Sequence, residues 1–357
     1  MPILSVVMVA VTSFGLTFLF SLAVKKFFPR LGLVDKPAKY GLSRKPIPYP
    51  GGVAIFLAFM ITILSYFTVS DGLIFDPKVS MVLLGATLLA VTCFVDDRHG
   101  LSPFLRLGVQ FVASVLLVIG GIGVSSISNP FGDPIILDSI KIPFSLGDVT
   151  FVFTLFADIL TIVWVMTMVN AFNWIDGVPG MASSTGAISS LILLLLSMRA
   201  GFHSTDQTLA IVLSATLLGA CLAFLIFDFP KPKMLMGDTG SMLIGFLLAV
   251  TALISGGKIA TTLLVLGFPI LDFLWVITRR ILHGKSPFKG DLWHFHHRFL
   301  KAGYSEGATV VFFASASLVF GMLALLLHTE GKVISFVLLF AVMITFATLL
   351  YSRKGVG

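Results

Sequence analysis

Charged residues are scarce in this sequence. Asp, Glu, Lys and Arg make up 11% of the 357 residues, whereas an average soluble domain contains about 25%. Hydrophobic residues make up 57%, and so few charged side chains cannot cover the surface of a soluble protein of this size. The composition therefore excludes an ordinary cytosolic enzyme and a disordered tail protein. It predicts an all-α, polytopic integral membrane protein.

Cysteine is nearly absent as well. Cys93 and Cys221 are the two cysteines, and both lie inside apolar runs. This excludes a secreted disulfide scaffold and gives no support to a metal or redox pair. Both cysteines are expected to be packing residues.

Long apolar runs, in contrast, are abundant. A membrane-crossing helix needs roughly 20 mostly apolar residues, and eleven runs approach or reach that length. No basic residue precedes the first run and two lysines follow it, which favours a first span over a cleaved signal peptide. The predicted spans are 3–24, 50–69, 78–95, 104–123, 151–171, 181–198, 208–227, 240–255, 259–278, 308–327 and 332–351.

The basic residues predict the orientation of these spans. With the N-terminus outside, nineteen of the 24 Lys and Arg residues fall on the cytoplasmic side, as the positive-inside rule requires. The net charge of +7 is therefore read as loop topology and not as a nucleic-acid surface. The C-terminus is expected in the cytoplasm, together with loops at about 25–49, 96–103, 172–180, 228–239 and 279–307.

Unusual polar residues gather in these cytoplasmic loops. Since all of them lie on one predicted face, they indicate a single site at the membrane interface. The strings are Asp96-Asp97, Asn170-Ala171-Phe172-Asn173 followed by Asp176, Gly237-Asp238-Thr239-Gly240-Ser241, and His294-Phe295-His296-His297-Arg298.

The acidic strings suit a divalent cation. Paired acids such as Asp96 and Asp97 offer the oxygen ligands that Mg²⁺ prefers, although a solvated helix end is the alternative. Asn173 and Asp176 would share one helix face at their i, i+3 spacing, or Asp176 would only cap the helix. Asp238 would either cap the next span or hold a cation beside free backbone N–H groups that bind phosphate.

The histidine string leaves three interpretations open. Zinc binding is one, although the spacing differs from the usual zinc motifs. An interfacial segment with incidental histidines is another. Phosphate binding by His294, His296 and His297 with Arg298 is favoured, because imidazolium and guanidinium groups donate to phosphate oxygens.

The four strings in this order resemble the polyprenyl-phosphate N-acetylhexosamine-1-phosphate transferases, the MraY-WecA-TagO superfamily of glycosyltransferase 4. The resemblance runs from Gly32-Leu33-Val34-Asp35-Lys36-Pro37 to the last spans. The strings around Asn173 and His294 resemble the WecA and TagO branch more than the branch that uses a UDP-muramoyl-pentapeptide. The resemblance implies one transmembrane transferase domain over 1–357 in a bacterial cytoplasmic membrane.

The resemblance also implies a reaction. Polyprenyl phosphate, expected to be undecaprenyl phosphate, attacks a UDP-N-acetylhexosamine to give a polyprenyl-diphospho-sugar and UMP, with Mg²⁺ or Mn²⁺ as cofactor. This step begins synthesis of a cell-envelope glycan such as O-antigen or teichoic acid. The expected partners are these two substrates and the membrane, without nucleic acid, and a homodimer is left open.

Site roles follow from motif position in the resemblance. Asp238 and Asn173 are expected to contact the metal, and Asn173 also the diphosphate. Asp96, Asp97 and Asp176 are expected to be catalytic. Since the second pKa of a phosphate monoester is near 6, the lipid phosphate needs no strong base, which favours metal holding and positioning for the Asp96-Asp97 pair. A covalent aspartyl intermediate stays open. The remaining substrate contacts are expected from Arg44, Lys45, His294, His296, His297 and Arg298.

Three departures from the family pattern concern substrate recognition. Pro179 and Leu235 replace an acid and an aromatic residue near the expected nucleobase pocket. Residues 40–43 lack the usual basic residues, so that contact is assigned to Arg44 or Lys45.

Other classes of protein remain as alternatives. A transporter or flippase for an anionic lipid or nucleotide would need ionisable groups near the bilayer centre, and only Asp158 and Asp272 lie well inside the runs or near their ends. A prenyl-diphosphate enzyme would leave the histidine string unexplained. A UDP-muramoyl-pentapeptide transferase of the same superfamily is the third alternative.

Overall fold

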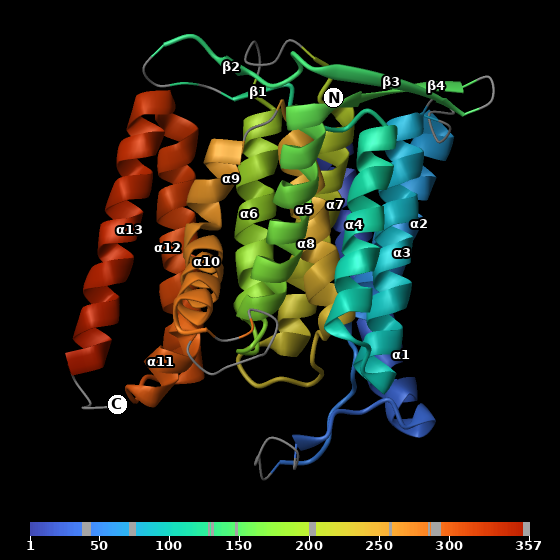
Figure 1. The fold of residues 1–357 in the computed structure, drawn as a ribbon. Helices are drawn as coiled ribbons and strands as arrows, with labels where there is room; N and C mark the ends of the chain where they lie inside the picture. Colours follow the sequence, from blue (N-terminus) through green and yellow to red (C-terminus); the bar gives the residue numbers. More distant parts are fainter. Residues whose placement is uncertain are drawn as a thin grey trace.

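The computed structural model is a bundle of helices with a thin β layer over one end (Figure 1). It describes residues 1–37, 44–70, 76–127, 129, 132–146, 149–199, 205–256, 259–284, 286 and 294–352. The helices are α1 (Ile3–Phe27), η1 (Phe28–Leu31), α2 (Gly52–Ser70), α3 (Pro77–His99), α4 (Pro103–Ile119), α5 (Leu155–Ile175), α6 (Met181–Ser197), α7 (Thr208–Asp228), α8 (Asp238–Ile254), α9 (Ile259–Val265), α10 (Gly267–Leu282), α11 (Phe295–Lys301), α12 (Glu306–Leu326) and α13 (Thr329–Ser352).

The prediction of an all-α membrane protein is confirmed. Among the described residues, seven helices are long and apolar enough to cross a membrane, and an eighth span is possible if the pair α9 and α10, bent by 85°, counts as one. The helices α4, α6 and α8 are apolar but shorter, with 17 residues each. Each of the eleven predicted runs coincides with a helix or with the bent pair, but the number of eleven crossings stays a prediction.

The outer helices carry the exposed apolar surface that lipid contact requires. Leu4 on α1, Leu326 on α12 and Val337 on α13 are 71%, 73% and 61% exposed. A soluble monomer rarely exposes such extended apolar surface. These faces are therefore suited to the hydrocarbon of a bilayer.

Helix α8 forms the centre of the bundle. All of its residues from Thr239 to Leu253 are buried, as expected for a helix that is apolar on every side. Gly245 lets α5 approach so closely that a Cβ there would lie 2.8 Å from the Met168 carbonyl oxygen. Small residues permit such close packing of membrane helices.

The β layer was not predicted from the sequence. It consists of two antiparallel pairs, β1 (Ser126–Ile127) with β2 (Ile135–Ile136) and β3 (Lys141–Leu146) with β4 (Val149–Thr154). The predicted span 151–171 therefore begins too early, since residues 151–154 belong to β4 and α5 starts at Leu155.

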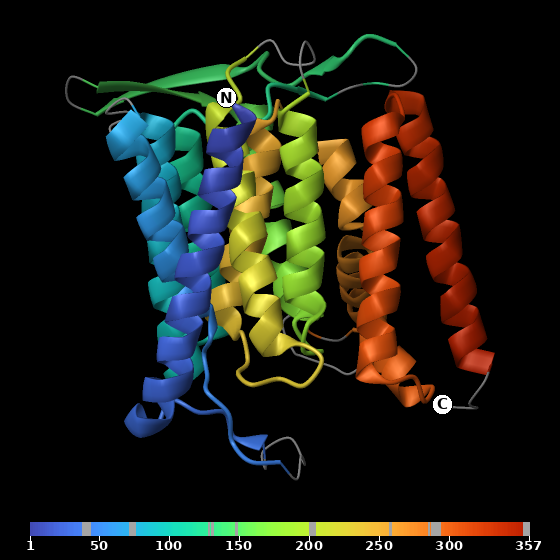
Figure 2. The same cartoon turned by 180° about the vertical axis from the view of Figure 1, so that it is seen from behind.

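The two ends of the bundle differ in character. The β layer and the N-terminus lie at one end in both views (Figures 1 and 2). At the other end, here called the motif end, α3, α5 and α7 finish, α8 begins, and α11 lies. The polar strings singled out in the sequence are all at this motif end.

Candidate active site

Four helix ends meet at the centre of the motif end, and local sequence explains why each lies there. Helix α3 stops at Gly100, whose φ of +72° suits a glycine after a helix end. Helix α4 follows at once, with Pro103 in its first turn and Ser102 as N-cap, its hydroxyl accepting from the Leu105 N–H at 3.2 Å. The C-terminal end of α5 and the start of α8 complete the site.

Asp97 joins α3 to the start of α8. Its Oδ1 accepts from the Asp238 N–H at 2.9 Å, and its Oδ2 accepts from the Thr239 N–H at 3.0 Å and the Thr239 hydroxyl at 2.6 Å. The Tyr49 hydroxyl donates to Oδ1 as well. Each carboxylate oxygen thus accepts two hydrogen bonds, which is close to the acceptor capacity of a carboxylate.

This arrangement corrects one expectation. The start of α8 was predicted to offer free N–H groups to phosphate, but the first two N–H groups of the helix donate to Asp97. The prediction is wrong for these two groups because a carboxylate from α3 caps α8 from outside. The N-cap residue itself is Gly237, and Asp238 is the first helical residue.

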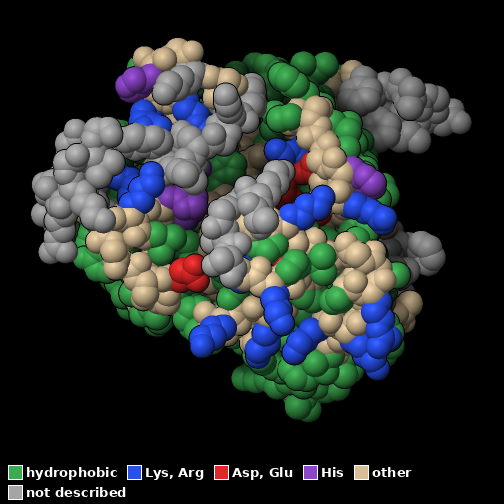
Figure 3. All heavy atoms as spheres, turned by 90° about the horizontal axis from the view of Figure 1, so that it is seen from below, with side chains coloured by type: hydrophobic (Ala, Val, Ile, Leu, Met, Phe, Trp, Pro, Cys, Tyr) green, Lys and Arg blue, Asp and Glu red, His purple; other side chains and the backbone are tan. Residues whose placement is uncertain are grey.

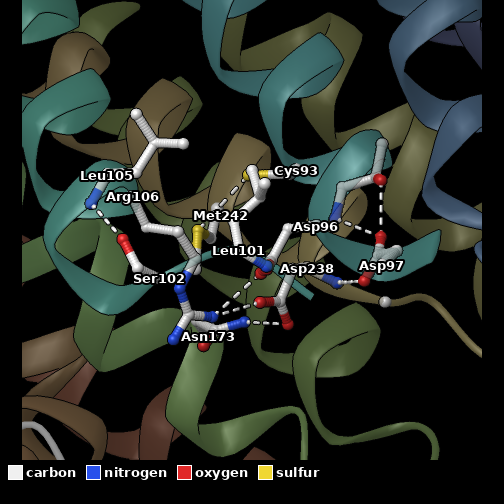
Figure 4. Close-up of polar contacts among 12 residues, drawn as sticks. Cys93, Asp96, Asp97, Leu101, Ser102, Leu105, Arg106, Asn173, Asp238 and Met242 are labelled. Carbon is white, nitrogen blue, oxygen red and sulfur yellow. Dashed lines mark hydrogen bonds and ion pairs between the residues drawn. The ribbon is translucent and has the colours of Figure 1, made fainter. Parts of the chain in front are cut away.

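Asp96 and Asp238 meet at one guanidinium group. Nη1 of Arg106 lies 3.0 Å from Oδ2 of Asp96 and 2.8 Å from Oδ2 of Asp238. The other oxygen of Asp96 accepts from the Leu101 N–H. Figure 4 shows the side chains of Asp96, Arg106 and Asp238 converging from α3, α4 and α8.

Asn173 connects α5 to the same centre. Its amide nitrogen lies 2.9 Å from Oδ1 of Asp238 (Figure 4). The same nitrogen lies 2.9 Å from the Ser241 hydroxyl. One turn earlier, the Asn170 amide donates to Gln110 on α4 at 2.6 Å. Polar contacts of two asparagines about one helical turn apart therefore hold the end of α5 beside α4 and α8.

Asp176 lies close to this centre and is linked to it through its backbone, since its N–H donates to the Asn173 carbonyl at 3.2 Å. It is the C-cap residue of α5, so the cap interpretation fits its position. Burial raises the pKa of the Asp176 carboxyl well above its usual range, and the nearby carboxylates of Asp228, Asp238 and Asp97 raise it further. Asp228 in turn accepts from the Gly180 N–H and the Ser183 hydroxyl, and so anchors the start of α6.

The histidine string forms the start of α11, and an aspartate on the neighbouring helix α10 orients it. Asp272 on α10 lies 2.9 Å from Nδ1 of His294 and accepts from the Phe295 N–H at 2.9 Å. The rings of His294 and His296 are nearly parallel at 5.6 Å between centroids. The His294 ring also meets the Trp174 ring edge-on at 4.9 Å.

His296 faces the turn after α5. A Cβ on Gly177 would lie 2.6 Å from Nε2 of His296, so the histidine string packs against the residue that follows Asp176. The His296 side chain is 1% exposed, and neither ring nitrogen has a hydrogen-bond partner among the described residues. Burial lowers the pKa of His296 well below its usual range, and His297 and His294 lower it further. Burial also lowers the pKa of Arg298.

The first loop contributes backbone pairing and Tyr49. Leu235 accepts from the Gly51 N–H and donates its own N–H to the Pro48 carbonyl, so this loop binds the segment that precedes α8. Burial and the Asp97 carboxylate raise the pKa of Tyr49, which keeps the hydroxyl protonated as a donor.

The predicted substrate contacts of this loop are not brought to the centre. Nη2 of Arg44 binds Asp35 at 2.6 Å, and Lys45 is exposed. Residues 40–43 lie outside the described residues. The assignment of substrate binding to Arg44 and Lys45 stays a prediction.

Sequence reasoning assigned no role in the site to four residues that the structure places there. Tyr49, Arg106 and Thr239 hold the carboxylates, and Asp272 orients His294. One signal was available: Arg106 lies in the first turn of an apolar helix, where a cation opposes the helix dipole and needs an acidic partner. The other partners are set by the packing of helices that are far apart in the sequence.

The motif end is rich in positive charge. Figure 3 views this end and shows many Lys and Arg side chains around it, while acidic side chains are visible in only a few places. Anionic substrates would therefore meet a favourable field on approach.

The acidic residues fit a loosely held divalent cation. In the described part of the chain, no three His, Cys, Asp or Glu side chains converge to hold a metal ion by themselves. Mg²⁺, however, uses one or two carboxylates and takes its remaining ligands from water and substrate phosphates. Asp96 and Asp238 meet this need, since oxygens from both already lie against one cationic nitrogen.

Comparison with known proteins gives consistent matches. The model of glycosyl transferase family 4 matches residues 79–256. The decaprenyl-phosphate N-acetylglucosaminephosphotransferase of Mycobacterium tuberculosis (strain ATCC 25618 / H37Rv) is 30% identical over 339 residues, which cover 87% of this chain and 79% of that protein. The probable undecaprenyl-phosphate N-acetylglucosaminyl 1-phosphate transferase of Bacillus subtilis (strain 168) is 26% identical over 327 residues, covering 90% and 84%. The undecaprenyl-phosphate alpha-N-acetylglucosaminyl 1-phosphate transferase of Escherichia coli (strain K12) is 28% identical over 357 residues, covering 97% and 90%.

Proposed function

The chain belongs to glycosyl transferase family 4, and from that premise we propose that it transfers N-acetylglucosamine 1-phosphate from UDP-N-acetylglucosamine to a polyprenyl phosphate. The relatives are named for this transfer to undecaprenyl or decaprenyl phosphate. The products are a polyprenyl-diphospho-sugar and UMP. Such a lipid-linked sugar would begin the synthesis of a cell-envelope glycan.

The observation that carries this proposal is the meeting of Asp96, Asp238, Asn173 and Arg106 at the motif end of the bundle. The carboxylates suit a cation that would bind phosphates, and the site lies where a lipid headgroup and a water-soluble nucleotide can meet. A phosphoryl transfer between two anions needs this mixture of charges.

The chemistry demands little proton transfer from the protein. An oxygen of the lipid phosphate forms a bond to the β-phosphorus of the UDP-sugar, and the bond from that phosphorus to the oxygen bridging to UMP breaks. The lipid phosphate is mostly a dianion at neutral pH, because its second pKa is near 6. Asp97, which accepts four hydrogen bonds, is therefore assigned to positioning α8.

A divalent cation, Mg²⁺ or Mn²⁺, would supply the charge neutralisation when bound. Asp238 would hold it, with Asp96 beside it and the Asn173 side-chain oxygen within the same site. Asp238 is 25% exposed at its side chain, so a ligand can reach it. The histidines and Arg298 would contact the sugar-nucleotide, and Asp272 would keep His294 in place.

We also propose that the motif end faces the cytoplasm of a bacterium. The positive-inside distribution of Lys and Arg supports this orientation, and UDP-sugars are cytoplasmic substrates. The N-terminus and the β layer would then lie on the outer side of the membrane.

The test is UMP release by purified protein in the presence of Mg²⁺ and polyprenyl phosphate. UDP-N-acetylglucosamine is expected to be used, and UDP-N-acetylgalactosamine is compared with it. Asp238→Asn is expected to lower the rate at least about 100-fold. Asp138→Asn, at an acid beyond β2 whose side chain is 43% exposed, is expected to leave the rate unchanged. Absence of UMP release from every UDP-sugar would favour a transporter instead.

A further inference from the structure

Arg106 occupies an unfavourable position for a cation. It lies in the first turn of α4, whose N-terminus carries the positive end of the helix dipole. Its side chain is 30% exposed, so it is also partly removed from water. A guanidinium group in this position must be compensated, and the compensation comes from other helices.

The compensation is a pair of carboxylates that share one nitrogen. Nη1 of Arg106 is 3.0 Å from Oδ2 of Asp96 and 2.8 Å from Oδ2 of Asp238. Those oxygens are therefore held less than 6 Å apart, by the sum of the two contacts. The Asp96 side chain is 9% exposed, and two such carboxylates repel each other unless a positive charge lies between them.

The same two oxygens are those assigned above to the divalent cation. A cation that binds Asp238 and Asp96 would replace Nη1 between them, since a carboxylate oxygen cannot face two cations at contact distance without repulsion between the cations. The guanidinium group and the divalent cation therefore compete for one position.

We propose that Arg106 is a resident counter-ion, which holds Asp96 and Asp238 in register while no divalent cation is bound and releases Asp238 when the cation enters. This rests on the cation site of the proposed function. Its consequence is a site that stays assembled without metal and binds the metal only moderately until substrate phosphates add ligands.

Cation binding without substrate tests this directly. Full-length protein in detergent is titrated with Mn²⁺, and free Mn²⁺ is followed by electron paramagnetic resonance. Arg106→Gln is expected to bind Mn²⁺ about tenfold more tightly than the wild type. Arg98→Gln removes an equal charge from the exposed end of α3 and is expected to change the affinity less than about twofold. Equal effects of the two variants, or weaker binding by Arg106→Gln, would overturn the proposal.

A second measurement uses the unmodified sequence and so does not depend on a variant folding. Phenylglyoxal modifies guanidinium groups, and mass spectrometry gives the rate at each arginine. Saturating Mg²⁺ is expected to speed modification of Arg106 at least about threefold and leave Arg98 unchanged. An unchanged or slower rate at Arg106 would contradict its release.

The failure of the underlying cation site has a different signature. Asp238→Asn is expected to abolish Mn²⁺ binding. If Asp238→Asn binds Mn²⁺ like the wild type, the cation lies elsewhere and the site assignment fails. If Asp238→Asn loses binding but Arg106→Gln gains nothing, the site stands and only the counter-ion proposal fails.

Discussion

Asp97 and Asp238 are both acids at the same helix junction, yet their surroundings differ. Asp97 accepts from two backbone N–H groups and two hydroxyl groups, whereas Asp238 is reached by Arg106 and Asn173 and is 25% exposed. The first arrangement is typical of a residue that holds structure together. The second is typical of a residue that exchanges partners with a ligand.

This difference predicts separable effects of two conservative changes. Asp97→Asn replaces one acceptor oxygen by an NH₂ group, which then faces two hydrogen-bond donors: either the Thr239 N–H and hydroxyl, or the Asp238 N–H and Tyr49 hydroxyl. The variant is therefore expected to lower the free energy of unfolding by about 1–3 kcal/mol. It is expected to lower the rate of UMP release as well. Asp238→Asn is expected to lose activity with a change in stability under about 1 kcal/mol. Thermal unfolding and UMP release are measured on both. Equal stability losses in the two variants would contradict the positioning role of Asp97.

His296 predicts a pH dependence of stability. Because burial lowers its pKa in the folded protein, it is neutral in both states at pH 7.5, and only the unfolded state takes up a proton as the pH falls through about 6.5. Stability is then lost below that pH, by at most about 1.4 kcal/mol per pH unit.

The measurement is the loss of Tm between pH 7.5 and pH 5.5. His296→Gln is expected to make this loss smaller, while His283→Gln, at an exposed position after α10, leaves it unchanged. If His296→Gln loses as much Tm between pH 7.5 and pH 5.5 as the wild type does, other titratable groups cause the pH dependence.

At the scale of elements, the site depends on how closely the starts of α2 and α8 approach. The Gly52 N–H donates to the Met236 carbonyl at 2.8 Å, and a Cβ on Gly52 would lie 2.1 Å from the Gly240 nitrogen. No side chain fits into that contact. The start of α8, with Asp238 in its first position, is therefore held at a distance that only glycine allows.

We accordingly predict that Gly52→Ala pushes α2 away from α8. The expected result is a loss of UMP release of at least about tenfold together with a lower Tm. Gly108→Ala is the matched control, because Gly108 lies inside α4 with no atom within 4 Å of an added Cβ, and alanine favours a helix over glycine by up to about 1 kcal/mol. If Gly52→Ala and Gly108→Ala have the same rate of UMP release and the same Tm, the close contact between α2 and α8 is not needed for activity.

At the scale of the whole molecule, the motif end and the β layer lie at opposite ends of a bundle with an apolar outer surface. Under the proposed function, a lipid substrate would approach this end from the bilayer and a nucleotide from the water on one side. The positive charge around the motif end (Figure 3) would favour both, because both carry phosphate.

The orientation in the membrane gives the last prediction. A reporter fused after Gly357 is expected to be active only as a cytoplasmic fusion, because nineteen of the 24 basic residues lie in the predicted cytoplasmic segments. A reporter inserted between β1 and β2, near Asp133, is expected on the outer side. If both reporters lie on the same side of the membrane, the chain crosses the membrane an even number of times between Asp133 and Gly357. That result would contradict the predicted spans and the proposed orientation.

Composition and apolar runs were sufficient to predict the class of the protein, and the polar strings singled out in the sequence all lie at the motif end. Scarce charge and repeated apolar runs are sufficient for an all-α membrane protein, because a bilayer imposes length and polarity on each span separately. Asp96, Asp97, Asn173, Asp176, Asp238 and the histidines could be singled out for the same reason, since polar groups at a membrane edge stand out one by one.

The packing of the helices separates the residues that hold the fold from those that a ligand can reach. Asp97 as the cap of α8, Arg106 between Asp96 and Asp238, and Asp272 behind His294 all involve partners from different helices. The separation in sequence between Arg106 and Asp238 is 132 residues. Such contacts follow from how helices pack and not from spacing along the chain, so periodicity and motif spacing do not identify which residues become partners.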